Sequence, residues 1–274
     1  MTPGSDVASG LDLVIVNDPD EAALRAAERV AATLAEAVTE RGRADWATTG
    51  GSSIIGIYRR LVAEPLREAV PWPAVHVWWG DDRYVPRDHP LSNVKPLDDI
   101  LLAIGLTEEG QAGRTWVGVP LPQQNLHPFR TGEALGSSRG AAWCAALLAD
   151  ELRAAHLPSQ GDWPVFDLLV LGVGADGHTL SVFPGSPALN GTELAMAIPA
   201  PAHIGPRVER VTLNPAVVGA ARSVLVVATG SGKAAVLADV FGATLDPGRW
   251  PAQLARRAGA TWILDAAAAA SLQH

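Results

Sequence analysis

The segment from residue 168 to residue 184 constrains the fold more than any other part of the chain. It opens with four consecutive large apolar residues, 168–171, which predict a strand buried inside a sheet. Three glycines follow within six residues: Gly172, Gly174 and Gly177. Glycine lets a backbone turn sharply and approach a ligand without a Cβ atom in the way. In open α/β sheets ligands bind just beyond the carboxyl ends of the strands, so we expect a site at this loop.

Two side chains of this loop are suited to acid–base chemistry. Asp176 and His178 stand two residues apart, just beyond the predicted strand. An imidazole with an ordinary pKa of about 6.5 takes up and releases protons near neutral pH, so His178 is the candidate general base. Asp176 either orients that imidazole or holds the loop by bonding its own backbone, and the residues alone leave both roles open.

The rest of the chain alternates short apolar runs with helical patterns. Asp18, Pro19 and Glu21 form a helix-start signal, and Gly42 is a plausible stop. Further helices are predicted from Ser52 or Ser53, over 140–155, after Lys233 and over 266–270. The predicted strands are 11–16, 46–49, 75–79, 115–119, 167–171, 196–198, 208–213, 224–228 and 261–264, and 120–140 is predicted as a long loop. This alternation predicts a mostly parallel sheet with helices on both faces.

Composition excludes several classes of protein. The net charge of −8 and the lack of a basic run argue against nucleic-acid binding, and an anionic substrate would need a locally positive pocket. Cys144 is the single cysteine, which suggests a buried structural thiol in a reducing compartment, so we expect a cytoplasmic protein. The first ten residues do not resemble a signal peptide, and no apolar stretch approaches membrane-spanning length, so no membrane association is expected.

Two nucleotide motifs are incomplete, and no cofactor is expected. Gly172, Gly174 and Gly177 match the dinucleotide fingerprint, but prolines at 184 and 187 leave no room for the helix that must start at the third glycine. The 229–233 segment resembles half a P-loop, but Ala234 replaces the residue that would bind magnesium. The histidines lack metal-ligand spacing, so no metal is expected either.

The 172–184 segment resembles the 6-phosphogluconolactonase signature GxGxDGHTxSLFP, with Val182 in place of leucine. Other segments match that family in order: Thr49–Ser53, Trp79–Pro86 with Asp88-His89 and Ser92-Asn93, Arg210–Leu213 and Ala228–Lys233. The resemblance runs from about residue 10 to the C-terminus. It implies a three-layer Rossmann-like α/β domain over 11–274 after a flexible N-terminus over 1–10. It also implies hydrolysis of a phosphorylated sugar lactone, with no obligate protein partner.

The resemblance assigns roles to individual residues. It implies that His178 is the base, that Asp81 belongs to the catalytic site and that Arg83 meets the substrate phosphate. Asp82 stands where the family has glutamate. Four further groups are expected to bind substrate: the backbone at Gly50, Gly51 and Ser52, and the side chains of His89, Arg210 and Lys233. Free N–H groups at a helix start bind anions, although the same glycines also suit a tight turn.

Two rival functions remain. Glucosamine-6-phosphate deaminase/isomerase shares the fold, but that family reads DEY where this chain has Asp81-Asp82-Arg83. It also continues GHIAFNEP where this chain differs after His178. A non-catalytic sugar-phosphate-binding regulator would usually carry a DNA-binding segment before the sugar domain. Because the first strand is predicted near residue 11, we expect no such segment.

Overall fold

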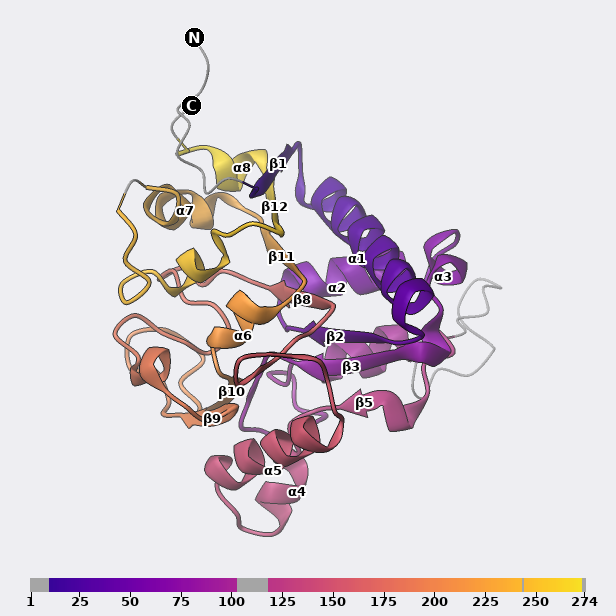
Figure 1. Ribbon diagram of the computed structural model, residues 1–274. Helices are drawn as coiled ribbons and strands as arrows, with labels where there is room; N and C mark the ends of the chain where they lie inside the picture. The colour runs from indigo at the N-terminus through magenta and orange to yellow at the C-terminus, as the bar shows by residue number, and fades with distance from the viewer. Residues whose placement is uncertain (1–9, 103–117, 243, 273–274) are drawn as a thin grey trace.

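A seven-stranded parallel sheet forms the centre of the protein (Figure 1). The computed structural model describes residues 10–102, 118–242 and 244–272, so the N-terminal segment and most of the strand predicted at 115–119 lie outside it. The strand order is β1-β12-β11-β8-β2-β3-β5. These strands are β1 Asp12–Val16, β2 Ala44–Thr48, β3 Val75–Trp79, β5 Leu126–His127, β8 Leu168–Leu171, β11 Ser223–Ala228 and β12 Ala260–Asp265. The predicted mostly parallel sheet is confirmed.

Helices cover both faces of this sheet. Figure 1 shows α1 and α2 on one side and α6 and α7 on the other. The helices are α1 Pro19–Arg41, α2 Ser52–Leu61, α3 Leu66–Ala69, α4 Thr131–Gly136, α5 Ala141–Ala154, α6 Ala216–Ala220, α7 Ala234–Val240 and α8 Ala266–Ala269. Shorter helical turns are η1 Trp72–Ala74, η2 Leu97–Leu101, η3 Gln123–Asn125, η4 Pro187–Asn190, η5 Ser231–Lys233 and η6 Pro251–Ala255. No helix in the described ranges has both the length and the apolarity needed to cross a membrane.

The signals predicted for α1 act as expected at both of its ends. The Asp18 carboxylate accepts a hydrogen bond from the Glu21 N–H at 2.8 Å, and the Glu21 carboxylate accepts one from the Asn17 N–H. This reciprocal pair satisfies N–H groups that a helix start leaves free. At the other end Gly42 adopts a left-handed conformation with φ of 72° and donates to the Val38 carbonyl.

A second, antiparallel sheet of order β4-β10-β9 packs beside the first. Its strands are β4 Asp81–Arg83, β9 Ala195–Ile198 and β10 Arg210–Leu213, and a two-stranded ribbon pairs β6 Ser159–Gln160 with β7 Trp163–Pro164. Gly80 joins the two larger sheets, because its N–H donates to Thr48 of β2 and its carbonyl accepts from Leu213 of β10. The sequence did not predict β4, since three consecutive polar residues carry no strand pattern.

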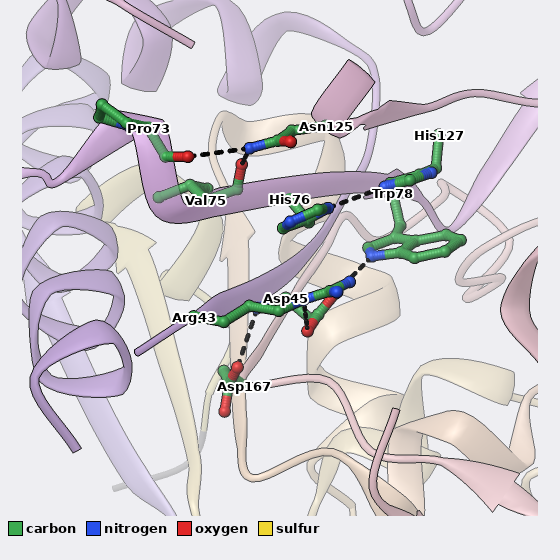
Figure 2. Close-up of polar contacts among 9 residues, drawn as sticks. All are labelled: Arg43, Asp45, Pro73, Val75, His76, Trp78, Asn125, His127 and Asp167. Carbon is green, nitrogen blue, oxygen red and sulfur yellow. Dashed lines mark hydrogen bonds and ion pairs between the residues drawn. The ribbon is translucent and has the colours of Figure 1, made fainter. Parts of the chain in front are cut away.

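The prediction that residues 120–140 form one long loop is wrong. This segment contains η3, β5 and α4, and β5 adds an edge strand to the main sheet through pairs of Leu126 with Val77 and His127 with Trp78. A two-residue strand is too short to show an apolar alternation. Side-chain contacts hold it instead: the Asn125 amide donates to the carbonyls of Pro73 and Val75 (Figure 2).

Two histidines join β5 to β3 on the sheet edge. His76 Nδ1 and His127 Nε2 lie 3.0 Å apart, and the His127 ring stacks on Trp78 with centroids 3.9 Å apart (Figure 2). Trp78 in turn donates to Asp45, which is paired with Arg43. Burial, and then the repulsion of a second positive charge at His76, lower the pKa of His127 to about 4. Burial also lowers the pKa of His76.

Acidification should therefore destabilise the fold through this pair. Between about pH 6.5, where an unfolded histidine titrates, and about pH 4, the unfolded chain binds more protons than the folded one, so stability falls with falling pH. The loss from pH 7.5 to pH 5 is expected to be on the order of 1 kcal/mol, because partial solvent exposure screens the effect. Urea unfolding at both pH values measures it. His127→Phe keeps a ring on Trp78 but cannot titrate, so it should reduce the pH dependence, and an unchanged dependence would contradict the prediction.

Candidate functional site

A cavity of about 320 Å³ opens where the carboxyl ends of β2, β8 and β11 converge. These three strands are neighbours in the parallel sheet, so the loops that follow them meet at the same edge. The small sheet supplies another wall through β4 and β10. Among the residues predicted from the sequence, those that line the cavity are Gly50, Gly51, Ser52, Asp81, Arg83, His178, Arg210 and Lys233.

Asp176 and His178 form a close pair in the glycine loop after β8. The Asp176 Oδ1 atom lies 2.5 Å from His178 Nδ1 and 3.2 Å from the His178 backbone nitrogen. Partial burial opposes ionisation of this carboxyl, but hydrogen bonds from His178 and His203 and the charge of His178 outweigh it and lower the pKa of Asp176. An ionised carboxylate only accepts, so Nδ1 carries the hydrogen, and in the neutral form of His178 the Nε2 atom has a free lone pair. Both roles that the sequence left open for Asp176 thus have a matching contact.

Gly174 makes this pairing sterically possible. A Cβ atom at this position would lie 2.0 Å from His178 Nδ1 and 2.6 Å from Asp176 Oδ1. Gly174 also closes the loop, because its N–H donates to the His178 carbonyl at 2.8 Å. Beyond Gly177 the chain turns, with an isolated bridge between Thr179 and Val182, and does not begin the helix that a dinucleotide site requires.

The two neighbouring carboxyls of β4 have different surroundings. Asp81 reaches the cavity, and its oxygens accept hydrogen bonds from the Asn93 amide at 3.0 Å and the Ser181 hydroxyl at 2.6 Å. Asp82 is fully buried, and burial raises its pKa to about 7. Its carboxyl accepts from the backbone N–H of Asn93 and the Ser92 hydroxyl, and so ties the following loop to β4.

Arg83 and Arg210 place two cations side by side on the cavity wall. They occupy paired positions of the antiparallel strands β4 and β10. Arg83 donates to the Leu91 carbonyl and Arg210 to the Pro206 carbonyl, each at 2.8 Å, but both Nε groups are buried with no partner in the described parts of the chain. Burial, and then the charge of Arg83, lower the pKa of Arg210. Buried donors without acceptors are costly, so this wall is suited to an anion.

Further groups that attract anions lie at the ends of β2 and β11. Gly51, with φ of 94°, is the N-cap of the ten-residue helix α2 and provides no side-chain cap for its N–H groups. Lys233 ends η5 after β11, and burial lowers its pKa while the charge of Asp176 opposes that shift. Within the described ranges its ammonium makes no hydrogen bond or ion pair.

Some residues of the site differ from the sequence prediction. His89 is not among the lining residues, and its Nδ1 accepts a hydrogen bond from the Leu91 N–H within a turn. Sequence reasoning took His203 for a structural or surface residue, gave Ser181 no role in the site and gave Asn93 none beyond the motif match. Ser181 and Asn93 are inside matched motifs, which was the only available signal, and nothing near His203 in the sequence indicates its contact with Asp176. No group of three or more His, Cys, Asp or Glu residues suited to a metal occurs in the residues that the structure describes.

Comparisons with known proteins agree on one family. The family model described as glucosamine-6-phosphate isomerases/6-phosphogluconolactonase matches residues 17–263. A Streptomyces coelicolor protein named 6-phosphogluconolactonase is 33% identical over 267 residues, covering 95% of this chain and 94% of that protein. A Synechocystis protein of the same name is 32% identical over 253 residues, covering 91% and 93%.

Solved structures have the same fold. A structure of 6-phosphogluconolactonase from Trypanosoma brucei matches with a TM-score of 0.78 and 28% identity, covering 96% of this chain and 98% of that one. A monomeric glucosamine-6-phosphate deaminase also matches, with a TM-score of 0.72 over 95% of this chain and 99% of that one. Its 15% identity supports a shared fold and nothing finer.

The contact at Gly174 generates a stability prediction. Gly174→Ala should lower the free energy of unfolding by about 1–3 kcal/mol, because the new methyl group must displace the His178 ring or the Asp176 carboxylate. Urea unfolding measures the loss, and a crystal structure of the variant should show the pair separated. Gly172→Ala is the matched control: its Cβ would meet no atom within 4 Å, so its stability should stay within about 0.5 kcal/mol. Equal stability of both variants would contradict the prediction.

Proposed function

Because the chain belongs to the family of glucosamine-6-phosphate isomerases and 6-phosphogluconolactonases, we propose that it hydrolyses 6-phospho-D-glucono-1,5-lactone to 6-phospho-D-gluconate. One observation carries this proposal. A single cavity contains the His178 imidazole, oriented by Asp176, together with Nε donors of Arg83 and Arg210 that have no partner in the part of the chain that the structure describes. A base and a cationic cradle are what a phosphorylated lactone requires. The reaction is the hydrolytic step of the oxidative pentose phosphate pathway.

In the proposed mechanism, His178 activates water. Its Nε2 atom removes a proton from a water molecule as the oxygen attacks the lactone carbonyl carbon. Asp176 holds the Nδ1–H group and stabilises the imidazolium that forms. The tetrahedral intermediate carries an oxyanion, which backbone N–H groups of the glycine loop stabilise. When the bond to the ring oxygen breaks, His178 returns its proton to that oxygen.

The substrate phosphate binds at the cavity wall that Arg83 and Arg210 form. Arg83 and Arg210 offer Nε groups that find no acceptor among the described residues, and planar guanidinium groups bind phosphate oxygens with well-defined geometry. The N–H groups at the start of α2 and the Lys233 ammonium face the same cavity. Since the protein carries a net charge of −8, this local cluster is what makes the cavity attractive to a dianion.

Replacement of His178 tests the base and the reaction together. Wild-type protein should convert 6-phosphogluconolactone to 6-phosphogluconate. His178→Ala should lower kcat by roughly 10²–10⁴-fold, which is the usual contribution of acid–base catalysis to the rate, and should change KM little. The assay follows acid release after subtraction of spontaneous hydrolysis. Glucosamine 6-phosphate is the control substrate and should yield no ammonia above background. Wild-type turnover of glucosamine 6-phosphate at a comparable rate would assign the protein to the other branch of the family.

Two lactones distinguish phosphate binding from other roles of the cations. Lys233→Ala and Arg83→Ala should each lower kcat/KM for 6-phosphogluconolactone by about 10- to 150-fold, the contribution of one hydrogen bond to a charged group. Unphosphorylated gluconolactone should be almost unaffected. Arg59→Ala, on the exposed surface of α2, controls for a change of net charge. Equal losses with both lactones would mean that the phosphate binds elsewhere.

A further inference from the structure

Asp176 is shared between two histidines, of which the proposed mechanism uses only one. Its Oδ1 atom faces His178, and its Oδ2 atom lies 2.7 Å from His203 Nε2. His203 belongs to the segment between β9 and β10, and its side chain is half exposed. It is not among the residues that line the cavity. Its polar contact with the site is the one to Asp176.

We propose that His203 is a positioning residue. It holds Oδ2 of Asp176 and so helps to keep Oδ1 on His178. Its hydrogen bond also weakens the electrostatic effect of the Asp176 carboxylate on the His178 imidazole. This role rests on the proposed function for its catalytic consequence, but not for its effect on the His178 ring. No covalent step is involved. The substrate and the reaction remain those proposed above.

Packing around the pair supports a fixed arrangement. The buried ring of Phe183 contacts both imidazoles. Its centroid is 4.7 Å from that of His178 and 5.8 Å from that of His203. The His203 contact is edge-on, at 88°. The same aromatic ring thus restrains both histidines, which come from segments 25 residues apart in sequence.

The segment that carries His203 also reaches the cation wall. Ile204 and Gly205 line the cavity, and the Pro206 carbonyl accepts the hydrogen bond from Arg210. Residues 203–206 therefore contact both ends of the site, with His203 on the acid–base pair and Pro206 on the arginine pair.

Electrostatics predicts the direction of the effect. The charged and titratable groups that act on Asp176 are His178, His203 and Lys233. When a carboxylate accepts hydrogen bonds from two imidazoles, each bond weakens the attraction of the carboxylate for the proton of the other imidazole. Without His203, the Asp176 carboxylate interacts with the His178 imidazole alone. His178 should then keep its proton up to a higher pH. Oδ1 stays on His178, but Asp176 is then held from one side only, so the orientation of the imidazole is less fixed and kcat falls.

The test compares His203→Ala with His203→Gln. A glutamine amide reaches about as far as Nε2 and donates in its place, but it does not titrate. His203→Ala should lower kcat for the phosphorylated lactone about tenfold, the loss of one charge-assisted hydrogen bond, with KM within about twofold. The acid limb of kcat/KM should move to higher pH by about half a unit to one unit, and glutamine should restore most of kcat. Glu209→Ala, an exposed change in the same segment, is the matched control and should alter neither quantity.

Ring NMR of His178 provides a readout that does not need turnover. The pH midpoint of the His178 ring signals, assigned by their loss in His178→Ala, should rise in His203→Ala. If wild-type protein lacks lactonase activity but this shift occurs, the positioning role holds and the proposed function fails. If the midpoint and the acid limb are unchanged in His203→Ala, the positioning role is overturned. Equal losses of kcat in the alanine and glutamine variants, with no shift, would likewise overturn it and leave a merely structural residue.

Discussion

The parallel pairing of β8 with β2 on one side and β11 on the other is the constraint on which the site depends. Parallel strands place their carboxyl ends at one edge, so three loops distant in sequence open into one cavity. One loop brings helix N–H groups, one brings His178 and one brings Lys233. A slip in the register of β8 would move the glycine loop relative to both neighbours and separate the imidazole from the groups on either side.

The antiparallel sheet adds what a parallel sheet alone does not supply. Gly80 carries hydrogen bonds to both sheets, and directly beyond it β4 turns acidic and basic side chains toward the cavity. Pairing with β10 then sets Arg83 opposite Arg210. Two like charges opposite each other destabilise a strand pair, and an anion bound between them would relieve that repulsion.

Much of this organisation could be predicted from the sequence, because it follows from the local conformational preferences of neighbouring residues. The Asp18 cap, the Gly42 stop and the apolar run of β8 each follow from a local preference that tertiary packing does not override. Motif matches then identified most of the lining residues. The failures share a cause: β4, β5 and the His203 contact are made by partners distant in the chain. A two-residue strand or a single histidine carries no periodicity, so nothing local indicates what it will meet.

The position of the cations has a consequence for the end of the catalytic cycle. In the proposed reaction, Arg83, Arg210 and Lys233 would bind a phosphate that hydrolysis does not alter, so they would hold substrate and product alike. Such uniform binding improves capture of a scarce substrate but delays departure of the product. Lactone opening would, however, create a new carboxylate next to His178, and the negative charge of Asp176 behind that imidazole would repel it. In the proposed reaction, the same aspartate that orients the base would thereby help to empty the cavity for the next turnover.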